Sequence, residues 1–375
     1  MIKFWLIIGT LLLFLAITGV VRGRDTAVPP HEGPELVLQT GGHTQEVLAA
    51  AWSPDGKWFV TSAQDGVLKI WDATDLRELR SLDIGAGRAL AITPDGNTII
   101  ISSGPRPAFV RVKDFHVQPG EGEITSGPAA VVVHPDGRHA VSADKENGCL
   151  REWDIETGQE LRCIAHVRTP TERLADEMSA LAISPDGRTL AVIAKPFSSK
   201  GRIVKIVDFQ SGEFRTPIFQ APDAIEGLAW SPDGKSLAFG LVSAKSLVVI
   251  DARSGAELFR RVLDRSPMSV AFTRDSKSVA GTGQFEVVIC DVASRCGEAR
   301  KLNLSSATMW GGAIAIHPDG TQLLAGASYS FTVFNLIQNT QVEKRPRGST
   351  NDASSTLPEH GSRWLDRATC TASGT

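Results

Sequence analysis

Residues 47–72 read VLAAAWSPDGKWFVTSAQDGVLKIWD, and this stretch decides the fold of the chain. Three short apolar runs are separated by two turn signals, Pro-Asp-Gly at residues 54–56 and Gln-Asp-Gly at residues 64–66. Glycine tolerates the positive φ that a tight hairpin needs, so each signal predicts a turn between antiparallel strands. Together with RELRSLDI at residues 77–84, the pattern predicts a unit of four consecutive strands.

The Pro-Asp-Gly turn recurs along the chain, and the aspartates of successive turns lie 40 to 50 residues apart. Further copies begin at Pro94, Pro135, Pro185, Pro232 and Pro318, and a degenerate copy begins at Arg274. A second marker, which reads Trp-Asp at residues 71–72 and 153–154, follows each turn 16 to 22 residues later. Self-similarity at such a period predicts a repeat architecture, here of seven units.

The strand before each turn has an unusual composition. Mostly bulky apolar residues flank a middle position that is Ala in six of the seven copies, as in Leu90-Ala91-Ile92. In a closed ring of radial sheets the inner strands crowd the axis, so one face must be small while the other packs on the next sheet. The pattern therefore predicts an all-β fold, a seven-bladed β-propeller of four-stranded antiparallel blades.

The chain resembles the WD-repeat (WD40) β-propeller family over about residues 35–345. The resemblance rests on Gly42-His43, on the Ser-Pro-Asp-Gly-Lys turns, and on the segments LKIWD and REWD that end at Asp72 and Asp154. It implies that a Trp, a Ser or Thr, a His and an Asp form a buried hydrogen-bonded set that braces a blade. The structural residues that match this set in the first and third repeats are His43, Ser62, Asp65, Trp71, Asp144 and Trp153. The third repeat uses Ser142 as its hydroxyl and lacks the His, and the other repeats lack the Trp.

Two segments are candidates for the outer strand of the seventh blade. Residues 35–40 precede the first inner strand and could join the two ends of the ring. Residues 340–345 follow the last marker at the usual distance and could complete the blade from its own end. The family resemblance favours the N-terminal strand.

The two ends of the chain differ from the repeats. Residues 4–21 form an unbroken apolar run of 18 residues, which would span about 27 Å as a helix. We therefore predict an N-terminal hydrophobic leader helix in residues 1–25, either a cleaved signal peptide or a transmembrane signal anchor. The protein is then exported, periplasmic or extracellular, and meets the membrane only through this segment. Residues 346–375 are polar and aperiodic, which predicts a disordered tail.

Charge excludes one class of partner. The sequence has 39 Lys and Arg against 42 Asp and Glu, which gives a formal net charge of −3. Proteins that bind nucleic acid through its phosphates normally carry a basic surplus. We therefore expect no nucleic acid partner, and the seven repeats predict a monomeric propeller.

Loop lengths indicate where a partner could bind. In a four-stranded blade, the loops that enter the inner strand share one rim with the loops that join the second and third strands. The fourth repeat carries both unusually long loops, at residues 166–179 and 195–202, so both fall on this rim. Long loops on a rigid scaffold often bind partners, although surface loops also tolerate neutral insertions.

Trp310 precedes the last inner strand on the same rim, and exposed Trp side chains are frequent at binding hot spots. The alternative is that Trp310 packs against a neighbouring blade. The predicted partner-binding residues are Arg168, Glu172, Arg173, Glu177, Lys195, Lys200 and Trp310.

Cysteine and histidine patterns predict no cofactor and no metal. Cys149 and Cys163 flank one hairpin between the third and fourth strands of a blade, and Cys290 and Cys296 flank another. Disulfides would form there only in the right strand register, and we expect free buried thiols. The eight histidines are scattered, and no cysteine pair has zinc-ligand spacing near a histidine pair. No nucleophile elbow or nucleotide-binding loop is present, so we predict no catalytic residues and no enzyme.

Two functions from different classes remain. The first is a non-catalytic scaffold that docks a protein or peptide on the loop rim, which the resemblance and the lack of catalytic motifs favour. The alternative is an exported propeller enzyme, lactonase-like or dehydrogenase-like, or a small-ligand sensor that uses the central channel. The alternative requires titratable side chains at the mouths of the inner strands, where the sequence is rich in Ala.

Overall fold

The computed structural model describes most of the repeat region. The described residues are 42–122, 127–144, 148–167, 177–195, 201–215, 218–221, 223–283, 285–304, 313–326, 331–336 and 340–344. The chain divides into two units, Met1–Gln39 and Thr40–Thr375, and every described residue belongs to the second unit. The predicted leader helix and the predicted disordered tail lie outside these residues. Within the ranges given above, no helix is long and apolar enough to span a membrane.

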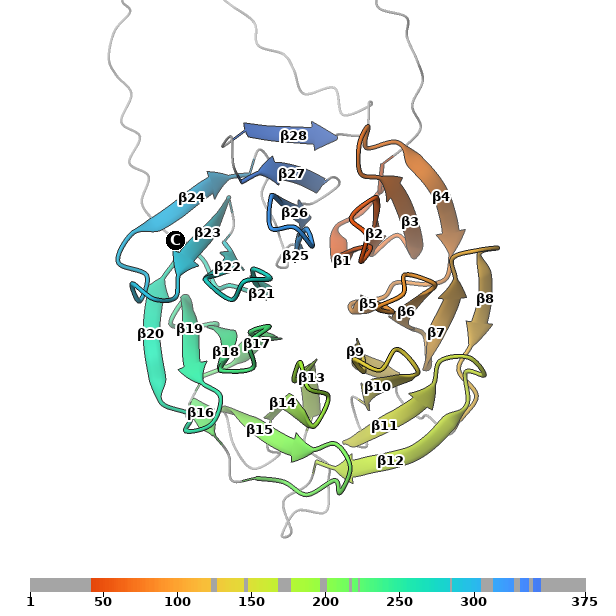
Figure 1. The fold of residues 1–375 in the computed structure, drawn as a ribbon, viewed down its shortest axis with the longest axis horizontal. Helices are drawn as coiled ribbons and strands as arrows, with labels where there is room; N and C mark the ends of the chain where they lie inside the picture. Colours follow the sequence, from red (N-terminus) through yellow and green to blue (C-terminus); the bar gives the residue numbers. More distant parts are fainter. Residues whose placement is uncertain are drawn as a thin grey trace, which may run out of the picture. The chain divides into compact units, whose positions relative to one another are not determined.

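The described residues form seven antiparallel sheets of four strands, arranged as blades around an axis (Figure 1). The predicted all-β, seven-bladed propeller is confirmed. Blade one consists of β1 (Val47–Trp52), β2 (Trp58–Ala63), β3 (Val67–Asp72) and β4 (Glu78–Asp83), and blade two of β5 (Leu90–Ile92), β6 (Thr98–Ser103), β7 (Arg106–Arg111) and β8 (His116–Pro119). Blade three consists of β9 (Pro128–Val133), β10 (His139–Asp144), β11 (Cys149–Asp154) and β12 (Glu160–His166), and blade four of β13 (Glu177–Ile183), β14 (Thr189–Lys195), β15 (Arg202–Asp208) and β16 (Phe219–Ala221). Blade five consists of β17 (Ile225–Trp230), β18 (Ser236–Leu241), β19 (Ser246–Asp251) and β20 (Glu257–Val262), and blade six of β21 (Val270–Phe272), β22 (Ser278–Thr282), β23 (Glu286–Asp291) and β24 (Ala299–Asn303). Blade seven consists of β25 (Ile314–Ile316), β26 (Gln322–Gly326), β27 (Phe331–Asn335) and β28 (Thr340–Lys344).

The Pro-Asp-Gly turns are held by their own polar side chains. In blade one, Ser53 Oγ donates to Asp55 Oδ1 at 2.8 Å and accepts from the backbone N–H of Trp58 at 3.1 Å. Asp55 Oδ1 also accepts from the backbone N–H of Lys57 at 3.1 Å, and Gly56 adopts a φ of 70°. These contacts explain why serine precedes the turn and why glycine completes it.

The hydrophobic core is divided among the boundaries between neighbouring blades. Between blades four and five, for example, the fully buried side chains of Val204, Leu237 and Phe239 pack together. The central Ala of the inner strands packs against such clusters, as Ala229 and Ala271 do. A larger side chain there would force adjacent blades apart, which accounts for the repeated Ala.

The seventh blade is completed by β28, which pairs with β27 from Phe331↔Lys344 to Asn335↔Thr340. The preference for the N-terminal strand as the outer strand of this blade was therefore wrong, and residues 35–40 lie outside the described residues. The short connection after β27 lets the chain turn back at once, so the pairing is local. Blade one lies next to blade seven in the ring (Figure 1). The two blades are joined by side-chain packing, and Trp52 Nε1 donates to the backbone oxygen of Ala315 at 3.2 Å.

Candidate functional site

A chain of four hydrogen-bonded side chains braces blade one. Trp71 Nε1 donates to Thr61 Oγ1 at 2.8 Å, and Thr61 Oγ1 lies 2.7 Å from His43 Nε2. His43 Nδ1 in turn lies 3.1 Å from Asp65 Oδ2, in the turn between β2 and β3. The contacts are consistent if the Thr61 hydroxyl donates to His43 Nε2 and the His43 Nδ1–H donates to the carboxylate.

The hydroxyl in this set belongs to Thr61, so the prediction of Ser62 was wrong. Adjacent residues of a strand point to opposite faces, and a shift of one residue therefore changes the partner completely. Ser62 Oγ donates instead to the backbone oxygen of Gly87 at 3.0 Å, in the segment that enters blade two. Thr61 braces one blade, whereas Ser62 joins two.

Asp65 is the charged end of the set. Burial by itself raises the pKa of the Asp65 carboxyl, but hydrogen bonds from His43 and from the backbone N–H of Thr44 outweigh it and lower the pKa to about 2. Thr44 N lies 2.8 Å from Asp65 Oδ2, and Val67 N lies 3.0 Å from Oδ1. The carboxylate thus ties the segment that enters β1 to the turn between β2 and β3.

Blade three keeps part of this set. Trp153 Nε1 donates to Ser142 Oγ at 2.8 Å, as Trp71 does to Thr61. Asp144 ends β10, whereas Asp65 stands in the turn after β2. Asp144 Oδ2 lies 3.8 Å from Arg151 Nε, so the buried Asp144 carboxylate forms an ion pair with the next strand.

Blade five has an equivalent brace that the repeat pattern did not predict. Asp223 lies before β17, and its Oδ2 accepts from the backbone N–H groups of Ser243 at 2.6 Å and Ala244 at 3.1 Å. Ser243 Oγ donates to Asp223 Oδ1 at 2.6 Å. The carboxylate comes here from the entering loop and the N–H groups from the second turn, the reverse of blade one. An Asp before an inner strand was the signal, without any Trp or His.

The predicted partner-binding residues are described only in part. Arg168, Glu172, Arg173, Lys200 and Trp310 lie outside the described residues. Glu177 begins β13 and Lys195 ends β14, and the two are paired directly across these strands. The backbone therefore places the end of the first blade-four insertion beside the start of the second, at one end of one sheet, as the loop lengths predict.

The central channel opens on the same rim. Its mouth is a cavity of about 330 Å³, lined by the first residues of the seven inner strands and the segments before them. Most of these residues are apolar or small, such as Ala49, Leu90 and Gly227. Arg88 and Glu226 are the ionisable residues among the described lining residues, and Glu226 Oε1 lies 3.2 Å from Arg202 Nη1.

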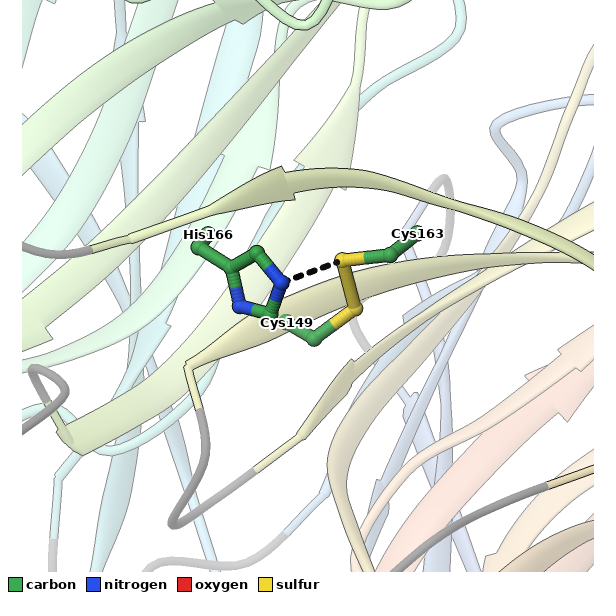
Figure 2. Close-up of side chains that lie close together, drawn as sticks. All are labelled: Cys149, Cys163 and His166. Carbon is green, nitrogen blue, oxygen red and sulfur yellow. Dashed lines mark hydrogen bonds between the residues drawn. A yellow bond between two sulfur atoms is a disulfide. The ribbon is translucent and has the colours of Figure 1, made fainter.

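Both cysteine pairs form disulfides, so the expectation of free buried thiols was wrong. Bulges in the β11–β12 ladder, one between Leu150 and Arg151, shift the register and bring the Cα atoms of Cys149 and Cys163 to 6.0 Å. Figure 2 shows His166 beside this disulfide, with Nε2 at 3.5 Å from Cys163 Sγ. The bond joins β11 to β12 at the end from which the chain continues toward the first blade-four insertion.

The second disulfide joins Cys290 of β23 to Cys296 in the turn that follows, with Cα atoms 4.6 Å apart. Cys296 adopts a φ of 57°, and its backbone N–H donates to the oxygen of Asp291 at 2.9 Å. The turn thus folds back on the strand, which the sequence alone did not indicate.

Comparisons with known proteins agree with this architecture. The family model "WD domain, G-beta repeat" (WD40) matches residues 34–72. The chain is 26% identical over 174 residues to the Serine-threonine kinase receptor-associated protein of Gallus gallus, which is 46% of this chain and 45% of that protein. It is 28% identical over 187 residues to the Angio-associated migratory cell protein of Homo sapiens, which is 46% of this chain and 38% of that protein. The matched part spans less than half the length of either relative.

Among solved structures, the chain is similar to "Kuenenia stuttgartiensis Hydrazine Synthase" with a TM-score of 0.65 and 17% identity, over 80% of this chain and 96% of that chain. At this identity the likeness concerns the fold alone. The protein is therefore a seven-bladed β-propeller. Its first blade carries the complete Trp–Thr–His–Asp set, and the match to the WD40 repeat model includes strands β1 to β3 of this blade.

Proposed function

We propose that this propeller is a non-catalytic scaffold that docks a protein or peptide on the rim around the channel mouth. The observation that carries the proposal is the placement of the two long insertions, which flank β13 and β14 of a single blade. The first insertion leads into Glu177 and the second follows Lys195, and these two residues pair at one end of a rigid sheet. Long loops anchored on a rigid scaffold are a common place for partners to bind.

The comparisons support a docking function. WD40 proteins generally bind protein partners, and the family match includes strands β1 to β3 of blade one. One relative is named as a receptor-associated protein, which agrees with a role in association. We expect the partner to be a protein or peptide and the propeller itself to be a monomer.

We propose further that the propeller works in an exported state, released or held by its N-terminal segment. The apolar run of residues 4–21 motivates this proposal. Two disulfides support it, because disulfides persist in oxidising compartments and are rare in the cytosol.

The alternative function places a small ligand in the channel mouth. The cavity of about 330 Å³ is large enough for a small molecule, and Arg88 and Glu226 could orient one. The scaffold is favoured because Glu226 already engages Arg202, so a ligand would have to compete with that ion pair.

The experiment is crosslinking and capture from the native envelope with the wild type and two variants. The rim variant replaces Arg168, Glu172, Arg173, Lys195, Lys200 and Trp310 with Ala. The control variant replaces Lys57, Lys235 and Lys277 with Ala; these three exposed side chains lie beside Pro-Asp-Gly-type turns on the opposite rim and pair with their own turn carboxylates. Both variants lower the net charge by three, so nonspecific electrostatic effects are matched.

We expect a specific protein to be recovered with the wild type and the control variant and lost with the rim variant. Equal recovery with all three would move the docking site off this rim. If no specific protein is recovered with any of them, the channel becomes the candidate site, and small ligands and lactones would be screened next.

A further inference from the structure

Blade three carries a side-chain cluster that the scaffold function does not use. His134 precedes the Pro-Asp-Gly turn between β9 and β10, Asp136 lies within the turn, and His139 begins β10. His139 Nδ1 lies 2.7 Å and His134 Nδ1 lies 3.0 Å from the same atom, Asp136 Oδ2. The three donor atoms all lie within 4.8 Å of one another. We propose that these three side chains form a binding site for a divalent first-row transition-metal ion such as Zn²⁺.

The hydrogen bonds of His134 indicate which of its ring nitrogens could bind a cation. Its Nε2 lies 3.1 Å from the backbone oxygen of Gly187 in blade four and donates its proton there. In this tautomer the Nδ1 lone pair faces Asp136 and accepts a long hydrogen bond from its backbone N–H at 3.2 Å, which a bound cation would replace. Metal-binding histidines commonly donate their other ring N–H to a carbonyl in this way, which fixes both tautomer and ring orientation.

Asp136 is oriented toward the same point. Its Oδ1 accepts from the backbone N–H groups of Arg138 at 2.8 Å and His139 at 3.2 Å. The other oxygen, Oδ2, therefore faces the two imidazoles. At 3.0 Å, Oδ2 and the unprotonated Nδ1 of His134 are two acceptors that repel each other. A cation between them converts this repulsion into coordination.

The donor set selects the class of ion. Two imidazole nitrogens and one carboxylate oxygen suit Zn²⁺ and neighbouring first-row ions, whereas Ca²⁺ and Mg²⁺ prefer oxygen ligands. Three protein ligands leave a fourth tetrahedral position open. His139 also lines a cavity of about 730 Å³ between blades two and three, which gives an ion a route from solvent.

Blade seven supplies an internal control. His317 precedes its turn, its Nε2 lies 3.1 Å from the backbone oxygen of Gly56, and its Nδ1 lies 2.5 Å from Asp319 Oδ1. The residue equivalent to His139 is Gln322. Blade seven thus repeats two of the three ligand residues, with the same Nε2 contact to a backbone oxygen, so comparing the blades tests the contribution of the second histidine.

The test is isothermal titration calorimetry, in which Zn²⁺ alone is added to the full-length protein. The protein is first treated with a chelator and is kept free of reductant. We expect one equivalent to bind the wild type. His139→Gln, which gives blade three the side chain of blade seven, should weaken binding at least about 100-fold, since loss of an outer partner alone costs about 10- to 100-fold. His317→Gln and His166→Ala should bind Zn²⁺ as the wild type does, since neither residue is a proposed ligand. His166→Ala controls for binding at the histidine beside the Cys149–Cys163 disulfide.

A second readout does not depend on variants. Zn²⁺ should shift the imidazole NMR signals of His134 and His139 in the wild type and leave those of His317 unchanged. The proposal is overturned if the wild type shows no saturable binding, if His139→Gln binds Zn²⁺ as tightly as the wild type, or if the shifted signals belong to other histidines.

Discussion

The hydroxyl of Thr61 serves two buried partners, accepting from the indole of Trp71 and lying 2.7 Å from the imidazole of His43. Replacing Thr61 with Val keeps the volume nearly constant and removes the hydroxyl from both contacts. A buried polar group that loses its partner costs about 1–3 kcal/mol. We therefore expect Thr61→Val to lower the free energy of unfolding by about 2–4 kcal/mol, measured by urea denaturation at neutral pH.

Ser62→Ala is the matched control at the residue scale. Ser62 is equally buried but makes one neutral hydrogen bond, to the backbone of Gly87, so its loss should cost about 1 kcal/mol. A larger loss for Ser62→Ala than for Thr61→Val would show that Ser62 is the structural hydroxyl of this blade.

At the scale of strands and hairpins, the two disulfides close chain segments of different length. Cys149 and Cys163 are separated by 14 positions, and Cys290 and Cys296 by 6. In the chain-entropy account the stabilisation grows with the closed loop, to about 3 and about 2 kcal/mol respectively. Replacing the first pair with Ala should therefore lower the free energy of unfolding more than replacing the second, when both double variants are unfolded in urea.

Thiol titration of the denatured wild type checks the premise of that comparison. The sequence has five cysteines, so two disulfides leave at most one reactive thiol per chain. Three or more thiols would mean that at least one disulfide is absent from the purified protein.

The elements differ in how far the sequence predicts them. The strand order within each blade was predictable because turn residues and strand alternation are local signals, as at residues 53–57. The outer strand of blade seven was not, because the choice between residues 35–40 and β28 depends on pairing rather than composition. The Cys149–Cys163 bond depends on a bulge beside Leu150 that leaves no composition signal, and the predicted rim residues remain largely a prediction from loop length.

At the scale of the whole molecule, six blade boundaries join consecutive repeats, and the seventh joins the first blade to the last. Because β28 belongs to the same repeat as β27, no strand described here crosses this last boundary. Aromatic packing occupies it: the ring centroids of Phe59 and Phe331 lie 5.1 Å apart, and those of Trp71 and Phe331 lie 4.9 Å apart. Phe331 therefore contacts two rings of blade one from blade seven.

Phe331→Ala should weaken ring closure in particular. Leu247→Ala is the matched control, because Leu247 holds the equivalent position at the boundary of blades five and six, is fully buried, and also pairs with a glycine of the preceding strand. Truncation of either core side chain costs roughly 2–5 kcal/mol. Only Phe331→Ala, however, removes packing where the two ends of the ring meet without chain connection. Hydrogen exchange should accelerate in β1 and β25 for Phe331→Ala and stay slow there for Leu247→Ala. Equal acceleration of exchange in β1 and β25 in both variants would mean that these strands exchange through unfolding of the whole ring and not through opening of the junction of its ends.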